Sequence, residues 1–471
     1  MSDKLVAVID QGSTSTKGAV FTLDGERLEL TSIPVERRLD GAGVRHDPEA
    51  LAHGVEEILQ TLLDRHHVSA FGIACQRSTC LVWERDGTRP LTDALSWQDR
   101  SQAARVEALM SHAEWVRERT GLRLTPYYAA PKLAALLAEA PGGAARAESG
   151  ELVAGTLDAF LVDRLTGSAA TEPGTAGRTL LYSLEDDRWD DRLLALFGLP
   201  EAAMPEIRTS AGRWGEFHGV PLLAVAGDQQ AALLGHGGWQ LGTTAAHFGT
   251  GAFVLASTGE RVVRHEGLLT AVLASTPATR RFQIEGSVNS AGSAVDWARA
   301  LTGVDLDAWS GRPIETGGAW VLPSFTGSGA PWWKTRSLGV VAGLELSTSP
   351  EEIFAAVLAG IAHRILDCIE AVSAAGIETT VLRVSGKLTR LGGMVQLLAD
   401  AGQVPVEISP EEQIGSLGLV RLIASQLEGG DDALLRAPTS IAQIEPAWSA
   451  QRAAEVRGQW GEFAAKALEL P

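Results

Sequence analysis

The feature that most constrains the fold is a polar turn between two apolar strands in residues 5–23, which read LVAVIDQGSTSTKGAVFTL. Gly12 allows a tight turn, in which successive backbone N–H groups can converge on one anion. Asp10 ends the first strand, where a carboxylate can hold a hydrated Mg²⁺ ion against phosphate oxygens. Further donors in the turn are Ser13, Thr14, Ser15, Thr16 and Lys17. The pattern fits a phosphate-binding hairpin, and it also fits an ordinary β-hairpin with a polar loop.

A second run of this kind, TTAAHFGTGAFVLAST, begins at Thr243 and places a Gly-Thr-Gly turn between two strands. Two phosphate-type hairpins predict an internal duplication, with one hairpin in each lobe and a nucleotide in the cleft between the lobes. The alternative is a coincidence between two unrelated hairpins. The duplication predicts a boundary near residue 241, which gives domains at 1–241 and 242–471.

Strand-like and helix-like segments alternate along the chain, which predicts an α/β fold. The clearest helix covers 350–374, where Ser349 and Pro350 mark its start and isoleucine or valine recurs every four residues from Ile353. The segments 141–150 and 311–330 are rich in Gly, Pro and Ala, and we expect loops there. Predicted strands are 5–10, 18–23, 70–75, 80–84, 221–227, 244–257, 268–275, 281–287, 380–385 and 404–408. The other predicted helices are 48–64, 98–110, 130–140, 229–236, 290–301 and 391–401.

Composition excludes several classes of protein. The chain has 471 residues and a formal net charge of −18, which argues against nonspecific binding to nucleic acid or to an anionic membrane. Three scattered cysteines are too few for a disulfide framework, so we expect buried thiols and a cytoplasmic location. No signal peptide is visible, and the longest apolar run is shorter than the ~20 residues that a membrane helix needs.

Three further segments place polar side chains after strands. In PLLAVAGDQQAALLGH, Asp228 could take the proton of an attacking hydroxyl, with Gln229 binding a neighbouring hydroxyl; the alternative is that Asp228 only caps a helix. In QRSTC, the guanidinium of Arg77 suits a polyhydroxylated or anionic ligand, unless it is a surface arginine in a hairpin. In SWQDR, Trp97 could stack on a polyol, unless it is a core tryptophan.

Taken together and in this order, these segments resemble the FGGY carbohydrate kinases, most closely the glycerol kinase-like members. The resemblance covers roughly residues 5–425. The motifs that carry it are AVIDQGSTSTK, GVRHDPEAL, QRSTCLVW, ALSWQDR, TGLRLTPYYAAPKL, GTLDAFLVDRLTG, GRTLLYSL, WDDRLLALFGLP, MPEIRTSAG, AGDQQAALLG, HFGTGAF, IEGSVNSAGSAVDW and LPSFTGSGAP.

The resemblance implies two actin-like (ribonuclease H-like) domains with an active-site cleft between them, and ATP-dependent phosphorylation of a hydroxyl on a small polyol or sugar. Asp228 would be the catalytic base and Asp10 the Mg²⁺-binding residue. The implied substrate-binding residues are Arg77, Ser78, Trp97, Tyr127, Asp228 and Gln229. The implied nucleotide-binding residues are Gly12, Ser13, Thr14, Ser15, Lys17, Gly249, Thr250, Gly251, Gly292, Gly386 and Lys387.

The chain departs from the family pattern at both ends of the predicted site. Ser78 stands where glycerol kinases carry a glutamate that helps to bind glycerol hydroxyls, so a longer polyol or a ketose could be the acceptor. Ser385-Gly386-Lys387 replaces the usual Asp-Gly-Gly on the adenosine side, and Lys17 replaces an arginine. Two alternatives therefore stay open, a non-catalytic sugar or nucleotide sensor and a kinase with another phosphoryl donor. Assembly as a homo-oligomer such as a dimer is also left open.

Overall fold

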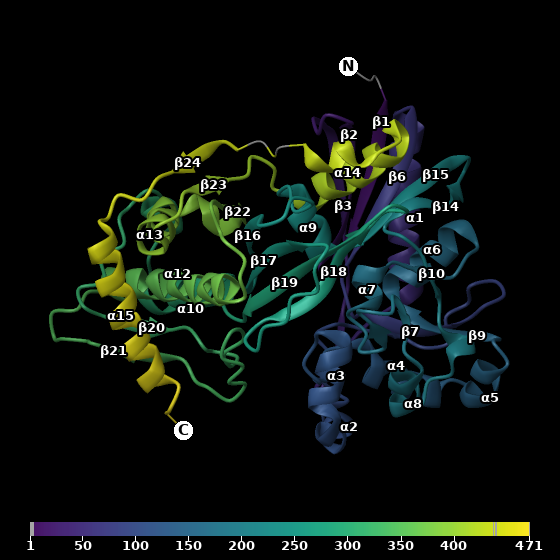
Figure 1. Cartoon of the computed structure of the whole chain (residues 1–471), viewed down its shortest axis with the longest axis horizontal. Coiled ribbons are helices and arrows are strands. Elements are labelled where there is room, and N and C mark those ends of the chain that lie inside the picture. The colour runs from purple at the N-terminus through teal and green to yellow at the C-terminus, as the bar shows by residue number, and fades with distance from the viewer. Residues whose placement is uncertain (1–3, 437, 439, 471) are drawn as a thin grey trace.

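The computed structural model describes residues 4–436, 438 and 440–470, with only the backbone of 307 and 308. Within these ranges the chain forms two lobes, each built on a large mixed sheet with helices against it (Figure 1). This arrangement confirms the α/β class and the two-lobed architecture predicted from the sequence.

The first sheet has the order β14-β15-β6-β1-β2-β3 and the second the order β18-β19-β17-β16-β22-β23-β24. The strands of the first sheet are β1 (Leu5–Gln11), β2 (Ser15–Thr22), β3 (Arg27–Pro34), β6 (Val68–Cys75), β14 (Ala211–Phe217) and β15 (Val220–Gly227). Those of the second are β16 (Thr244–Phe248), β17 (Ala252–Gly259), β18 (Leu269–Ser275), β19 (Arg280–Val288), β22 (Leu382–Gly386), β23 (Val406–Ile408) and β24 (Ala442–Ile444).

The two sheets share a six-strand pattern, and β18 adds a seventh strand at the edge of the second sheet. In each, an antiparallel hairpin (β1–β2 or β16–β17) is extended on one side by a third antiparallel strand and on the other by parallel strands. The run predicted as one strand at 244–257 is therefore this second hairpin. The repeated order supports the internal duplication inferred from the two Gly/Thr turns.

Smaller sheets extend the lobes. A five-stranded sheet contains β4 (Arg38–Asp40), β5 (Gly43–His46), β8 (Ala94–Leu95), β7 (Cys80–Glu84) and β9 (Leu152–Thr156). The pairs are β10 (Ala170–Thr171) with β13 (Glu206–Ile207), β11 (Tyr182–Ser183) with β12 (Arg188–Trp189), and β20 (Trp320–Leu322) with β21 (Val340–Ala342).

The helices cover these sheets. Those of the first half are α1 (Pro48–Arg65), α2 (Ala103–Ala108), α3 (Ala113–Thr120), α4 (Ala129–Glu139), α5 (Gly143–Glu148), α6 (Leu157–Thr166), α7 (Pro173–Ala176), α8 (Asp191–Phe197) and α9 (Asp228–Gly235). Those of the second are α10 (Gly292–Thr302), α11 (Leu306–Trp309), α12 (Pro350–Ala374), α13 (Gly392–Gly402), α14 (Ile414–Glu428) and α15 (Ala450–Ala467). Short 3₁₀ turns lie at Met110–His112, Glu201–Ala203, Lys387–Arg390 and Asp431–Leu435.

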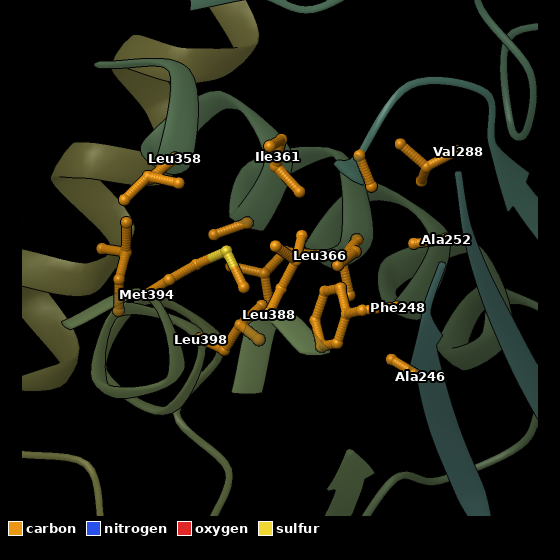
Figure 2. Packing of buried hydrophobic residues seen from close by; sticks show 14 of the residues in the cluster. Ala246, Phe248, Ala252, Val288, Leu358, Ile361, Leu366, Leu388, Met394 and Leu398 are labelled. Atoms are coloured by element: carbon orange, nitrogen blue, oxygen red, sulfur yellow. The ribbon is translucent and has the colours of Figure 1, made fainter. Parts of the chain in front are cut away.

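The helix predicted at 350–374 is confirmed as α12, and its start is held by a reciprocal capping box. Ser349 Oγ accepts from the N–H of Glu352 at 3.2 Å, and the Glu352 carboxylate accepts from the N–H of Ser349 at 2.7 Å. Its buried side chains, including Leu358, Ile361 and Leu366, join Phe248 of β16 and Met394 of α13 in the core of the second lobe (Figure 2).

Three further predictions of local structure were wrong. Residues Trp320–Leu322 form β20 inside the expected loop 311–330, because Val321 and Leu322 are buried and the strand pairs with β21. Residues 143–148 form α5 inside the expected loop 141–150, because small alanines in GAARAE suit a helix despite the flanking glycines. The helix predicted at 98–110 begins only at Ala103. The preceding residues form a loop, in which the Asp99 carboxylate accepts hydrogen bonds from the backbone N–H groups of Val44 in β5 and of Ser101. The three cysteines are buried free thiols, as expected.

Helix α14 ties the lobes together. It lies between β23 and β24 of the second sheet in sequence, but its Leu419, Leu422 and Ile423 lie in a core that includes Val6 and Val8 of the first sheet. It packs against β1, β6 and β15 of that sheet, and Figure 1 shows it with the strands of the first sheet. The boundary proposed after residue 241 falls between α9 and β16, and it stays a prediction. No helix in the described part of the chain is long and apolar enough to cross a membrane.

Candidate active site

Three neighbouring parallel strands bring the predicted catalytic side chains to one edge of the first sheet. Asp10 of β1 pairs with Ala74 of β6, and Cys75 of β6 pairs with Gly227 of β15. Asp10, the turn that starts at Gln76 and the start of α9 therefore lie together at the carboxyl ends of the strands, where open α/β sheets commonly bind ligands.

Asp228 is the first residue of α9, and Gly227 occupies the N-cap position. The capping alternative for Asp228 was therefore wrong. Its carboxylate accepts from the backbone N–H of Gln229 at 2.9 Å and from the Gln229 side-chain amide at 3.2 Å. Arg77 Nε lies 3.4 Å from Asp228 Oδ1, and the Asp228 side chain keeps 34% of its surface exposed. The carboxylate is thus oriented by two hydrogen bonds and an ion pair and is still partly exposed.

Arg77 is buried, so the alternative of a surface arginine was also wrong. Its Nη1 and Nη2 donate to the two oxygens of Glu285 on β19 at 2.7 and 3.2 Å. Gly227 leaves room for the aliphatic part of the Arg77 side chain, because a Cβ at position 227 would come within 2.9 Å of Arg77 Cδ. Arg178 Nη2 also donates to Glu285, at 2.9 Å. Burial alone would raise the pKa of Glu285, but Arg178 and Arg77 outweigh it and lower that pKa to about 2.

The Ser78 backbone has a positive φ of 63°, and its hydroxyl donates to the carbonyl of Arg178 at 3.0 Å. A fully buried lysine, Lys132, fixes this turn by donating to the carbonyls of Ser78 and Ser96 at 2.7 and 2.8 Å. Trp97 follows Ser96 and is 37% exposed, so it is not the core tryptophan of the alternative reading. Tyr127 is 42% exposed, whereas the next residue, Tyr128, is buried.

The first hairpin turn is closed by a hydrogen bond from Gly12 N–H to the carbonyl of Ser15 at 3.1 Å. Lys17 lies opposite Asp10 in the strand register and donates to Gln413, at the start of α14, at 3.0 Å. Burial raises the pKa of Asp10 to about 6; Lys17 opposes this rise, and Asp228 adds to it. The two carboxylates and the ammonium group therefore share one electrostatic environment.

The second hairpin turn meets the start of α10. Gly249 N–H donates to the carbonyl of Gly251 at 2.8 Å, and Gly292 N–H donates to the carbonyl of Gly249 at 3.1 Å. A Cβ on Gly251 would come within 2.7 Å of the carbonyl of Val288, so the chain needs glycine there. Thr250 is held between these glycines, since its carbonyl accepts from Ser293 N–H at 3.0 Å.

Gly386 ends β22 opposite Phe248 and has a φ of 100°. A Cβ on Gly386 would clash with the carbonyl oxygen of Phe248, so only glycine fits there. Lys387 follows on the exposed surface of the next turn. Ser385 lies between two imidazoles, because its hydroxyl is 3.0 Å from both His236 Nε2 and His247 Nδ1. Burial lowers the pKa of both histidines, that of His236 to about 3, so both are neutral near pH 7.

The structure thus gathers Asp10, Arg77, Ser78, Asp228 and Gln229 on the first lobe, and Gly249, Thr250, Gly251, Gly292 and Gly386 on the second. Sequence reasoning missed Glu285, Arg178 and Lys132. Arg178 and Lys132 stood inside the quoted motifs GRTLLYSL and YYAAPKL, and Glu285 inside IEGSV. Charged residues within such apolar runs were the available signal.

Two family models match the chain: the N-terminal domain of the FGGY family of carbohydrate kinases over residues 5–235, and the C-terminal domain over 244–427. The chain belongs to the FGGY family of carbohydrate kinases, enzymes that phosphorylate an alcohol group. A glycerol kinase from Thermus brockianus is 40% identical over 425 residues, which cover 86% of each chain.

Solved structures agree on the fold. The crystal structure of Plasmodium falciparum glycerol kinase with ADP superposes with a TM-score of 0.92 at 24% identity, covering 99% of both chains. A xylulose kinase from Brucella ovis gives 0.89 at 21% identity, covering 99% of this chain and all of that one. At these identities the likeness establishes the two-lobed kinase fold.

Proposed function

We propose that the protein transfers the γ-phosphoryl group of ATP to a hydroxyl of a small polyol or sugar, with Asp228 as the base. The observation that carries the proposal is the convergence of Asp10, Arg77 and Asp228 at the ends of three parallel strands. The relatives named as glycerol and xylulose kinases support a small hydroxylated acceptor, and the one solved with ADP supports ATP as donor. Family membership favours this kinase over a non-catalytic sensor.

The Asp228 carboxylate would accept the proton of the attacking hydroxyl as the hydroxyl oxygen bonds to the γ-phosphorus. The bond from that phosphorus to the β,γ-bridging oxygen breaks, and ADP leaves with the electron pair. Arg77 and Gln229 hold the Asp228 carboxylate in place, so the protein contributes mainly position and charge. The glycine turns at 12 and 249–251 would supply backbone N–H groups to the phosphates.

The residues present fit a phosphate-bound Mg²⁺ ion. No group of three or more His, Cys, Asp or Glu side chains that could hold a metal occurs among the described residues. Mg²⁺ on a nucleotide needs only one or two carboxylates, because phosphates and water supply the other ligands. Asp10, whose pKa is raised by burial, is suited to this role, and the ion would neutralise charge on the transferring phosphate.

The test is an ADP-release assay with ATP, Mg²⁺ and a panel of polyols and sugars. Asp228→Asn keeps the shape of the side chain and removes the base, so turnover should fall by about 10²–10⁴-fold. Asp191→Asn is a matched control, because Asp191 is also the first residue of a helix, α8, and is exposed in the first lobe. If no acceptor gives turnover that depends on Asp228, the proposal is wrong.

A further inference from the structure

Arg178 carries buried donors that find no acceptor in the described part of the chain. Its side chain is only 8% exposed, and its Nη2 donates to Glu285. Among the described residues, neither Nε nor Nη1 of this guanidinium has a hydrogen-bond partner. Leaving charged N–H groups buried and unpaired is costly, because their hydration is lost without replacement.

These donors lie within the predicted acceptor end of the site. The carbonyl of Arg178 receives the hydroxyl of Ser78, and its guanidinium lies 5.4 Å from the ring centre of Tyr128. Glu285 pairs with both Arg178 and Arg77, and Arg77 in turn contacts Asp228. The unpaired donors therefore belong to the group of residues that surrounds the proposed base.

The carboxylates nearby are already engaged, Asp228 by Arg77 and Glu285 by both Arg77 and Arg178. One carboxylate, Glu285, serves two guanidinium groups, and both of its oxygens are engaged. Ser78 offers a short hydroxyl that already donates to a backbone carbonyl. Lys132 is already engaged by the carbonyls of Ser78 and Ser96. A neutral polyol would leave Nε and Nη1 of Arg178 without an anionic acceptor.

We infer that the acceptor substrate is a hydroxylated carboxylic acid, a small sugar acid whose carboxylate binds the free donors of Arg178 while a hydroxyl faces Asp228. The inference rests on the proposed kinase activity and specifies its substrate class. Ser78 determines this specificity, because its small side chain leaves the Arg178 donors to the substrate. Guanidinium is the protein group best matched to a carboxylate.

The test compares acceptors that differ only at one terminal carbon: glycerol with glycerate, erythritol with erythronate, and xylitol with xylonate. For the wild-type enzyme with ATP and Mg²⁺, kcat/KM for the best acid should exceed that of its alcohol by about ten- to hundredfold, the range expected for one charge-assisted hydrogen bond. A preference for the alcohol in every pair, or equal rates, would overturn the inference.

Two variants locate the effect. Arg178→Lys keeps the charge and removes Nε–H and the planar fork, so it should reduce the acid preference about tenfold or more. Ser78→Glu introduces a carboxylate beside Arg178 and should reverse the preference in favour of the alcohol. Arg281→Gln is the matched control: Arg281 also has an unpaired buried Nε and stacks on an aromatic ring, Trp239, but it pairs with Glu260 outside the site. Its variant should keep the wild-type preference.

Failure of this inference is distinguishable from failure of the kinase proposal. Asp228-dependent phosphorylation of alcohols without acid preference would refute only the substrate class. If nothing is phosphorylated, the kinase proposal fails, and calorimetry with erythronate and erythritol still decides the inference. Erythronate must then bind at least tenfold more tightly to the wild type, and Arg178→Lys must remove the difference; equal binding would refute it.

Discussion

Replacing Glu285 by glutamine removes the carboxylate that two buried guanidinium groups share, and its effect can be worked out in two ways. Lowering the pKa of Glu285 from its usual 4.5 to about 2 corresponds to about 3 kcal/mol of stability at neutral pH. Removing one partner of a buried ion pair costs about 3–5 kcal/mol, because the remaining charge stays buried. We therefore expect Glu285→Gln to lower the free energy of unfolding at pH 7 by about 3 kcal/mol.

The pH dependence gives a sharper test, since the Glu285 pKa is lower in the folded than in the unfolded protein. The stabilisation from Glu285 is fully present above pH 4.5 and is lost as the pH falls towards 2. The difference between wild type and Glu285→Gln should be constant from pH 7 to 5. Below pH 4.5 it should shrink by at most about 1.4 kcal/mol per pH unit. Urea denaturation followed by tryptophan fluorescence measures both.

A matched control lies beside the same strand. Glu260 pairs with Arg281 of β19 at 3.5 Å but is 64% exposed, so Glu260→Gln should change stability by less than about 1 kcal/mol. A loss at Glu285 no larger than at Glu260 would refute the reasoning. The reasoning would also be refuted if Glu285→Gln lost about 3 kcal/mol of unfolding free energy and this loss stayed constant below pH 4.5, because the loss would then come from packing instead of charge.

Three other predictions follow from buried polar groups. Asp10→Asn should abolish Mg²⁺-dependent turnover and raise the melting temperature at pH 7. The stability gain arises because the raised Asp10 pKa of about 6 makes the ionised carboxylate destabilising in the folded protein. Thermal melts at several pH values should therefore show that the gain vanishes below pH 4, where the carboxyl group is protonated in both states. Lys132→Met frees the carbonyls that hold the Ser78 turn, so KM for the acceptor should rise more than KM for ATP in steady-state kinetics. Ser385→Ala leaves two imidazoles without their shared hydroxyl, and urea titration should show a loss of about 1–3 kcal/mol.

The parts of the fold that could be predicted from the sequence are those fixed by local pattern. Helix α12 was predicted to the residue, because its cap, its proline and its apolar period agree. The strand β7 at 80–84 was also predicted to the residue, since an apolar run between polar turns marks it. Helix α14 was missed, because its buried face spans two lobes and its glycines argue against a helix.

The positions of candidate residues could be predicted where a turn follows a strand, as at Asp10, Asp228 and Gly249. They could not be predicted where the partner is remote: Arg77 and Glu285 are 208 residues apart, and only the packing of β19 against the first lobe brings them together. A single sequence carries no signal for that pairing. Hence Arg77 was assigned to the substrate alone, although its fork is engaged by Glu285.

Two of the departures from the family pattern, Ser78 and Ser385, are each matched by a neighbouring group in the structure. Ser78 bonds to the carbonyl of Arg178, and Ser385 bonds to two neutral imidazoles that a carboxylate at this position would tend to protonate. A residue whose hydrogen-bond partners are buried does not contribute independently of them, so substitutions in such a group are not additive. We therefore expect the effect of each departure to depend on its partners, which are Arg178 for Ser78 and His236 and His247 for Ser385.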